Sequence, residues 1–290
     1  MERVLVTGAS GLLGSTIVKI AETSFEVIPS HNTKRIHPNS LKADVTNKKE
    51  VLSVLQAADP DVVIHTASET NVDKCETNRD QAWRVNVEGT RNIAEACREM
   101  HAKLVYISTD YVFDGRQGLY TEEDEANPVN QYGLTKLKGE EQVRTLCKDH
   151  LILRTSVLYG SCPWKTSFSK WVMNSIERKQ EITVVDDHYN SPTLTENMAE
   201  MTLEAAHRNF MGLYHASGSE RISRYEFAKQ IAKAFSLDEQ LVKPIKLSEV
   251  TTWKAKRPRD SSLSLRKINL LKTKPLNIRQ GLSKMKERET

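Results

Sequence analysis

The stretch Arg3-Val-Leu-Val-Thr7 is followed at once by Gly8-Ala-Ser-Gly11-Leu-Leu-Gly14. The first five residues form a short apolar run typical of a buried strand, and residues 12–22 carry apolar side chains at helical spacing. Glycines between a strand and a helix permit a tight turn, let backbone N–H groups approach a pyrophosphate, and allow the helix to pack close to the strand. The stretch therefore predicts a dinucleotide-binding loop, with an ordinary glycine-rich turn as the alternative.

The same alternation continues along the chain. Runs typical of strands occur at residues 25–28, ended by Pro29, and at 62–64, 104–107, 151–153 and 182–185. Helical periodicity covers residues 48–58, 80–100, 132–146, 165–179, 195–208 and 223–235. This order predicts an α/β fold with a doubly wound parallel sheet covered on both faces. We expect a dinucleotide-binding domain over residues 1–160 and a smaller, mainly substrate-binding region over 161–290, partly interleaved with the last strands of the sheet.

Composition limits the class of protein. With 290 residues, of which 38% are hydrophobic and 28% charged, the chain has the length and composition of a globular protein. No apolar run approaches the ~20 residues of a membrane helix, so no membrane partner is expected and the expected compartment is the cytoplasm. The four cysteines show no C-x-x-C spacing and the eight histidines no H-E-x-x-H motif, so no metal site is predicted.

The net charge of +4 is unevenly distributed. Residues 242–290 hold 14 Lys and Arg against 4 Asp and Glu, which indicates either an anionic partner or a solvated face. This segment contains one Trp and neither Phe nor Tyr, so it offers few surfaces on which bases could stack. We therefore expect a phosphorylated small molecule as ligand, and no nucleic acid.

The end of the second predicted strand bears on the choice of dinucleotide. Sites that prefer NAD usually offer an Asp or Glu to the adenosine ribose, whereas residues 30–35 read Ser-His-Asn-Thr-Lys-Arg. A 2′-phosphate would meet polar and basic groups here. The sequence thus favours NADP(H), with NAD(H) left open.

Tyr132 and Lys136 lie one helical turn apart, so their side chains share a helix face. A cation beside a phenol lowers the pKa of the tyrosine, which suits general acid–base catalysis. Thr109 follows a predicted strand at the edge where open α/β sheets bind ligands, and its hydroxyl is suited to hold a carbonyl oxygen. Together the three predict hydride transfer to or from a carbonyl. For the Tyr–Lys pair alone, a surface helix is the alternative.

Several further stretches carry a family resemblance. They are Ser-Thr-Asp-Tyr-Val-Phe-Asp-Gly at 108–115, Tyr-Gly-Leu-Thr-Lys-Leu-Lys-Gly-Glu at 132–140, His-Thr-Ala-Ser at 65–68 with Val72-Asp73, Asn-Val-Glu-Gly at 86–89, and Arg-Pro-Arg-Asp-Ser-Ser-Leu at 257–263. With the glycine loop, this set resembles the dTDP-4-dehydrorhamnose reductase family of the extended short-chain dehydrogenase/reductase superfamily. The resemblance runs from residue 3 to about residue 282. It implies a Rossmann-type sheet, a small C-terminal α/β substrate domain, and NADPH-dependent reduction of dTDP-4-dehydro-6-deoxy-L-mannose to dTDP-L-rhamnose.

The resemblance also implies a role for individual residues. The cofactor would be held by Gly8, Ser10, Gly11, Leu12, Leu13, Gly14, Asp44, Val45, Thr66, Ala67, Ser68 and Lys136. Thr109 and Asp110 would contact the sugar, Tyr132 would protonate the C4 oxygen, and Arg257 would pair with the nucleotide diphosphate. Structural alternatives are a helix-capping role for Asp44, a backbone-stabilising role for Asn86, and a place in a basic run for Arg257.

One departure from the family pattern leaves other functions open. Family reductases often carry a sugar-stacking Trp where this chain has Val157, and Trp164 is the nearest replacement in the sequence. The Leu158-Tyr-Gly160 form also resembles the regulatory β subunit of methionine adenosyltransferase, a dinucleotide-binding partner of another enzyme. That role, and another nucleotide-sugar reductase or epimerase, are the alternatives. A homodimer is a further expectation.

Overall fold

The computed structural model describes residues 1–162 and 165–288. Among these residues, seven strands form one sheet in which all neighbouring strands are parallel. From edge to edge they are β11 (Gly212–His215), β6 (His150–Thr155), β5 (Lys103–Thr109), β4 (Val62–His65), β1 (Arg3–Thr7), β2 (Glu26–His31) and β3 (Leu41–Lys42). The predicted doubly wound parallel sheet is confirmed, and the strand order changes direction between β1 and β4.

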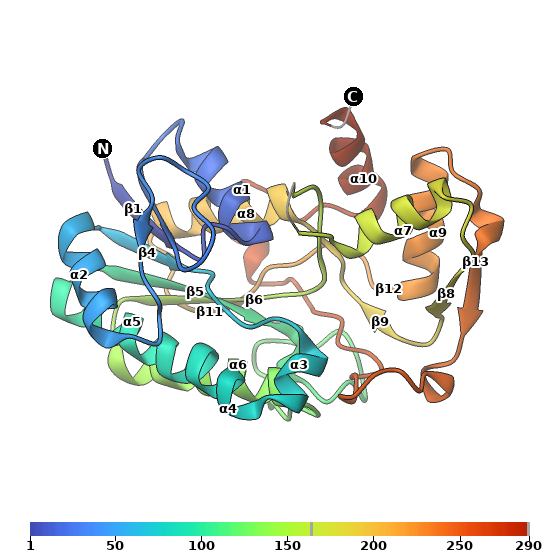
Figure 1. Cartoon of the computed structure of the whole chain (residues 1–290), viewed down its shortest axis with the longest axis horizontal. Coiled ribbons are helices and arrows are strands. Elements are labelled where there is room, and N and C mark those ends of the chain that lie inside the picture. Colours follow the sequence, from blue (N-terminus) through green and yellow to red (C-terminus); the bar gives the residue numbers. More distant parts are fainter. Residues whose placement is uncertain (163–164, 289–290) are drawn as a thin grey trace.

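Helices cover both faces of this sheet (Figure 1). On one face, α1 (Leu12–Ala21) and α8 (Thr195–His207) pack together over a core that includes Ile17 and Met198. On the other, α2 (Lys48–Ala58), α5 (Gly89–Met100) and α6 (Gln131–Leu146) bury Leu55, Ile93 and Val143 against the strands. Because both faces are covered, the strands appear in the sequence as continuous apolar runs.

Two predicted elements differ from the structure. Pro29 lies within β2 and does not end it; β3 pairs only with Ser30 and His31, so at Pro29 the strand is still an edge strand, where proline is tolerated. The helix predicted over 80–100 is divided into α4 (Arg79–Trp83), a π-helical turn (Arg84–Glu88) and α5, preceded by α3 (Val72–Thr77). Such turns are frequent at functional sites, and this one places the buried side chain of Asn86.

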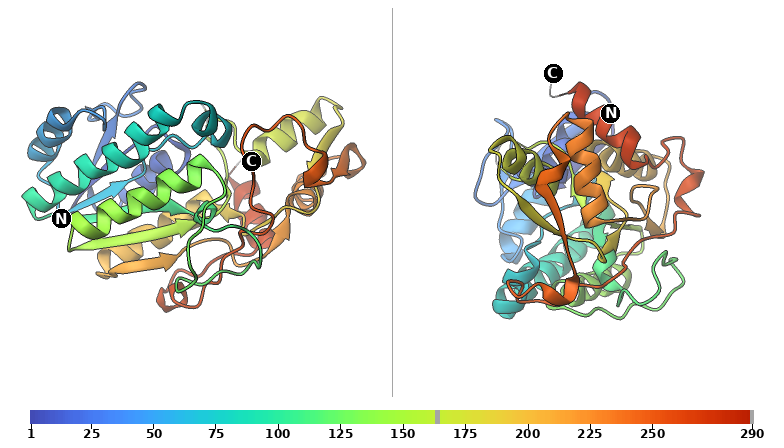
Figure 2. Two further views of the ribbon diagram at one scale, coloured as in Figure 1. Left: turned by 90° about the horizontal axis from the view of Figure 1, so that it is seen from below. Right: turned by 90° about the vertical axis from the view of Figure 1, so that its right-hand side faces the viewer.

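A smaller lobe lies at one end of the sheet (Figures 1 and 2). It contains α7 (Phe168–Glu177), α9 (Arg224–Ala234), and the paired strands β8 (Ile182–Val185) and β13 (Val242–Ile245). The rings of Tyr159 and Phe227 meet edge to face at 5.1 Å between centroids in its core. The other elements are the short strands β7 (Leu158–Tyr159), β9 (Tyr189–Asn190), β10 (Thr193–Leu194) and β12 (Ile222–Ser223), and the helix α10 (Ile278–Glu287).

The chain beyond residue 160 also returns to the large sheet. The helix α8 packs on α1, and β11 pairs with β6 at the sheet edge. Short 3₁₀ turns occur at Asp110–Val112, Glu239–Leu241, Leu247–Glu249 and Ile268–Leu270. Within the two described segments, no helix combines the length and apolarity that crossing a membrane requires.

Candidate active site

A cleft of about 660 Å³ lies between the sheet and the smaller lobe. The carboxyl ends of β1, β4, β5 and β6 line one side, and residues of the smaller lobe, among them Phe168 and Arg224, line the other. This is the edge at which open α/β sheets bind ligands. The predicted site residues that line it are Gly8, Ser10, Gly11, Leu12, Leu13, Gly14, Thr66, Ala67, Ser68, Thr109, Asp110, Tyr132 and Lys136. Asp44, Val45 and Arg257 lie outside this lining.

The glycine loop is packed too closely for larger residues. Gly8 has φ +67°, and a Cβ atom there would lie 2.6 Å from the backbone nitrogen of Ala67. A Cβ on Gly14 would lie 2.4 Å from the carbonyl oxygen of Gly8. The loop after β1 is therefore pressed against the loop after β4, and α1 begins directly over it.

The start of α1 is suited to an anionic group. Its N-cap is Gly11, which provides no side-chain hydrogen bond to the first turn. The first backbone N–H groups of the helix lack intrahelical partners, and the helix dipole adds partial positive charge there. Because Gly11, Leu12 and Leu13 line the cleft, this helix end fits the diphosphate of a dinucleotide. Lys34, which follows β2, also lines the cleft.

Asp44 and Val45 have local partners. Asp44 Oδ1 accepts hydrogen bonds from the backbone N–H and the hydroxyl of Thr46, at 2.9 and 2.8 Å. The side-chain cap of α2 is Asn47, which accepts from the N–H groups of its first turn. The carbonyl oxygen of Val45 accepts from Asn92 Nδ2 at 2.9 Å. These contacts fix the loop before α2, and the adenine-binding role of the two residues stays a prediction.

The three predicted catalytic side chains meet in the cleft. Thr109 is the last residue of β5, and Tyr132 and Lys136 lie in the first two turns of α6. The side chain of Thr109 is close enough to the Tyr132 hydroxyl to lower the pKa of the phenol. Lys136 Nζ donates to the carbonyl oxygen of Ile107 at 2.7 Å and lies 4.0 Å from the centre of the Tyr106 ring.

Burial shifts the pKa values of Tyr132 and Lys136. It raises the pKa of the Tyr132 phenol above its ordinary value, although the neighbouring Thr109 hydroxyl lowers it. Burial also lowers the pKa of Lys136 to about 7, although the Glu140 carboxylate raises it. The predicted lowering of the phenol pKa is therefore wrong, because desolvation dominates and the lysine Nζ is held by the Ile107 carbonyl. The phenol is protonated at neutral pH and can donate its proton.

Asp110 joins three segments behind the catalytic residues. Its Oδ1 accepts from Thr109 Oγ1 at 3.0 Å, and its Oδ2 accepts from Ser156 Oγ and Ser261 Oγ at 2.8 and 2.5 Å. Burial raises the pKa of this carboxyl, whereas the hydroxyl donors lower it. The residue lines the cleft, but its oxygens already have protein partners, so its predicted contact with a sugar stays a prediction.

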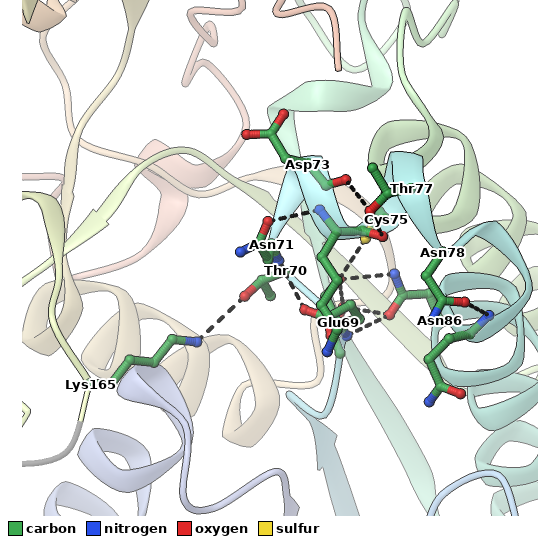
Figure 3. A network of polar contacts seen from close by, with 12 residues as sticks. Glu69, Thr70, Asn71, Asp73, Cys75, Thr77, Asn78, Asn86 and Lys165 are labelled. Carbon is green, nitrogen blue, oxygen red and sulfur yellow. Dashed lines mark hydrogen bonds and ion pairs between the residues drawn. The ribbon is translucent and has the colours of Figure 1, made fainter. Parts of the chain in front are cut away.

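Figure 3 shows how the π-helical turn supports the loop after β4. Asn86 Oδ1 accepts hydrogen bonds from Ser68 Oγ and from the N–H of Glu69, each at 2.8 Å. Its Nδ2 donates to Thr135 Oγ1 at 3.0 Å, directly before Lys136. One buried amide thus joins the loop that lines the cleft to the catalytic helix. The structure gives Asn86 a backbone-stabilising role.

A second cavity, of about 680 Å³, adjoins the first. The two cavities share Val72, Tyr111, Phe168 and Arg224. Further walls come from the smaller lobe and the segment 249–257, including Trp171, Trp253, His188 and Arg257. Aromatic and aliphatic walls with a few polar groups suit a flat, partly polar ligand such as a nucleobase.

Arg257 lines the second cavity and already has partners. Its Nη2 pairs with Asp73 Oδ2 at 3.0 Å, its Nη1 donates to the Ala255 carbonyl at 2.8 Å, and its guanidinium lies 4.8 Å from the centre of the Trp253 ring. Arg224, which lines both cavities, was not predicted from the sequence. It belongs to no motif, and its only signal was its position at the start of a predicted helix.

Val157 occupies the position at which family reductases often carry a tryptophan. Val157 lines the cleft with φ +41°, a backbone conformation that β-branched residues rarely adopt. Trp164, the suggested replacement, lies outside the described residues. Among residues 1–162 and 165–288, no three His, Cys, Asp or Glu side chains gather in a way that could hold a metal ion.

Comparisons with known proteins agree with this geometry. The family model described as the RmlD substrate binding domain matches residues 1–290. A dTDP-4-dehydrorhamnose reductase of Aggregatibacter actinomycetemcomitans is 32% identical over 280 residues, covering 92% of this chain and 92% of the relative. The methionine adenosyltransferase 2 subunit beta of Rattus norvegicus is 33% identical over 276 residues, covering 93% of this chain and 82% of the relative.

The comparison with solved structures extends to the whole fold. The crystal structure of dTDP-4-dehydrorhamnose reductase from Bacillus anthracis in complex with NADP has a TM-score of 0.90 at 34% identity, covering 100% of this chain and 99% of that one. These findings confirm the predicted resemblance, the Rossmann-type fold and, at the level of the family, an oxidoreductase that uses a nicotinamide dinucleotide. Since the family model matches the full length and the relatives exceed 30% identity over most of it, the chain belongs to the RmlD substrate-binding domain family, that of the dTDP-4-dehydrorhamnose reductases.

Proposed function

We propose that this protein uses NADPH to reduce the C4 ketone of dTDP-4-dehydro-6-deoxy-L-mannose to dTDP-L-rhamnose. The observation that carries the proposal is the meeting of Thr109, Tyr132 and Lys136 in one cleft with the uncapped start of α1. Such a reduction requires a site that binds the diphosphate of the cofactor and a residue that donates a proton to the ketone oxygen. The reductase relatives, at 32% and 34% identity, support the same reaction.

The residues of the cleft fit a dinucleotide. The loop from Gly8 to Gly14 would hold its diphosphate, Thr66, Ala67 and Ser68 its ribose and nicotinamide side, and Lys136 the nicotinamide ribose. Asp44 and Val45 are the proposed adenine contacts. We propose NADPH over NADH because residues 30–35 lack an acid and Lys34 lines the cleft. Arg35 is engaged elsewhere, since its Nε donates to the His37 carbonyl at 3.3 Å.

The proton comes from the protein. The bound dinucleotide supplies a hydride to C4 of the ketone. Tyr132, which burial keeps protonated, donates its hydroxyl proton to the C4 oxygen, so the ketone becomes a secondary alcohol. Thr109, whose side chain lies beside that hydroxyl, would help to position it. The sugar would thus occupy the first cleft, and the nucleotide would extend into the second cavity, where Trp171 and Trp253 offer flat surfaces and where Arg257, predicted to pair with the diphosphate, lies in the wall.

The test is direct. Purified protein, NADPH and substrate generated in situ should give a loss of absorbance at the reduced-nicotinamide band. Tyr132→Phe should lower kcat by about 10²–10⁴-fold while NADPH still binds, because only the proton donor is removed. Tyr214→Phe, in the edge strand β11, is the matched control and should leave kcat unchanged. Turnover by Tyr132→Phe equal to that of the wild type would contradict the mechanism.

A second candidate is a regulatory, dinucleotide-binding subunit of a methionine adenosyltransferase. It is favoured by the beta-subunit relative at 33% identity and by Val157 in the wall of the cleft. In this case the protein should co-purify with methionine adenosyltransferase from its source cells, and Tyr132→Phe should not weaken that association. Absence of such a complex, together with turnover of the sugar nucleotide, would decide for the enzyme.

A further inference from the structure

Arg224 stands where the two cavities meet, since it lines both of them. It is the first residue of α9, behind the cap Ser223, whose side chain accepts from the N–H of Glu226. The backbone N–H of Arg224 donates to the carbonyl oxygen of His188 at 3.0 Å. The start of the helix is therefore fixed to a wall of the second cavity, and the position of the arginine is defined by backbone contacts.

The guanidinium of Arg224 lies among aromatic side chains. The group lies 5.0 Å from the centre of the Phe168 ring, and the Tyr111 side chain beside it raises its pKa. Within the described part of the chain, it forms no ion pair with a carboxylate at 4.0 Å or less. Asp110 is the nearby acid that raises its pKa, but the oxygens of that carboxyl accept from three protein hydroxyls.

Removing the Arg224 guanidinium from water costs free energy when no anion pairs with it. Burial lowers the pKa of Arg224, which reflects the cost of removing a guanidinium from water, and the neighbouring Arg257 lowers it further. Arg224 is half-buried, and a charge that is partly removed from water is normally compensated by an opposite charge. At this position, that charge can come from a ligand that passes from one cavity into the other.

We propose that Arg224 binds the phosphate next to the sugar in a nucleoside-diphosphate sugar, and is the principal anion-binding residue of this protein. The inference deepens the proposed function and rests on it, because it assumes a ligand whose sugar lies by Tyr132 and whose base lies in the second cavity. A planar guanidinium can give a phosphate two parallel hydrogen bonds. Arg257, whose charge is balanced by Asp73, then serves mainly to hold the wall that carries Trp253.

Binding of three probes tests the proposal. Titration calorimetry with dTDP, UDP and thymidine, in excess NADP⁺, compares the wild type with Arg224→Gln. We expect dTDP to bind the variant at least ~30-fold more weakly. Thymidine should bind equally to both proteins because it has no phosphate, and it also reports that the variant is folded. Arg224→Lys should lose less affinity, since it keeps the charge but not the planar fork.

A matched control removes a positive charge from the same helix. Lys229 lies on α9 outside both cavity linings, 3.9 Å from Glu239, and Lys229→Gln should bind dTDP as the wild type does. Wild-type affinity of Arg224→Gln for dTDP would overturn the proposal, and so would an equal loss for dTDP and thymidine. If diphosphates bind through Arg224 but the ketone is not reduced, the proposed reaction fails and the anion site stands. If neither dTDP nor UDP binds the wild type, both are overturned.

Discussion

The two cavities are lined by different kinds of structure, strand ends in the first and loops in the second. The first lies over the ends of regular strands, and behind it Glu140 and Arg154, 0% and 3% exposed, form an ion pair at 2.8 Å. The second is closed by loops, where Asp73 and Arg257, 33% and 9% exposed, pair at 3.0 Å. Both pairs join a carboxylate to an arginine at a similar distance, but only the first is shielded from water. The two ion pairs therefore differ mainly in their exposure to solvent, and variants of each show how much that exposure changes the free energy of unfolding.

Glu140 holds several elements behind the first cleft. Its carboxylate accepts Nε and Nη2 of Arg154, each at 2.8 Å, and Ser108 Oγ at 2.6 Å. Arg144 adds a further donor from the same helix at 2.8 Å. Because Ser108 directly precedes Thr109, this one carboxylate fixes the ends of β5 and β6 against α6. The catalytic residues are thus supported by a buried and fully hydrogen-bonded charge.

The largest predicted effect is on this pair. Glu140→Gln should lower the free energy of unfolding by about 3–5 kcal/mol, because it leaves the buried guanidinium of Arg154 without its counter-ion. Glu141→Gln is the control on the same helix: its carboxylate is half-exposed and pairs with Lys138 at 2.9 Å. That change should cost at most ~1 kcal/mol. Urea denaturation of both variants measures the difference, and similar losses would contradict the role of burial.

The next effect concerns Lys136 and pH. Burial lowers its pKa to about 7 in the folded protein, whereas an unfolded lysine titrates near ~10.4. Between these values the unfolded state binds a proton that the folded state lacks, so stability rises with pH in this range. Relative to Lys136→Met, the wild type should gain about 4 kcal/mol between pH ~6.5 and pH ~10.

Chemical denaturation across this pH range gives the measurement. Lys138→Met, at a partly exposed position of the same helix, is the control and should show little pH-dependent difference from the wild type. A constant difference between wild type and Lys136→Met over the whole range would show that the lysine stays charged in the folded protein. In that case a partner other than the Ile107 carbonyl would have to stabilise its charge.

The parts of the first cleft that could be predicted are local in sequence. A strand, a glycine loop and a helix follow one another within residues 3–21, so their pattern alone places the phosphate-binding end of α1. Tyr132 and Lys136 are one turn apart on a single helix, and the structure brings both to the cleft. The pKa of Tyr132 could not be predicted in this way, because desolvation depends on the surrounding residues of β5 and α3 and not on spacing within one helix.

The second cavity shows the limit of sequence patterns more clearly. His188, Arg224 and Trp253 come from three distant segments and meet only in the folded chain. None of them belongs to a recurring pattern, and the sequence therefore pointed to Arg257 alone. The π-helical turn was not predicted for a similar reason. The apolar periodicity of residues 80–100 is helical throughout, whereas the π-helical turn is associated with the contact between the Asn86 amide and Thr135, which is distant in sequence.

The smallest predicted effect concerns the pair at the second cavity. Asp73 Oδ1 accepts from the N–H groups of Lys254 and Ala255, each at 2.9 Å, and Oδ2 accepts from Arg257. Although burial raises it, these hydrogen bonds leave the pKa of Asp73 below its ordinary value. A carboxyl with a lowered folded-state pKa stabilises the protein above the unfolded-state value near ~4, and this stabilisation is lost as pH falls through the folded-state pKa.

Asp73→Asn should therefore lower the free energy of unfolding by only about 1 kcal/mol at neutral pH, because solvent screens the partly exposed pair. The difference from the wild type should shrink below pH ~4, where the wild-type carboxyl takes up its proton. Asp80→Asn, at an exposed position of α4, is the control for the loss of one negative charge. If Asp73→Asn costs as much as Glu140→Gln, exposure does not distinguish the two pairs. The loops around the second cavity would then be held as firmly as the strands that end at the first.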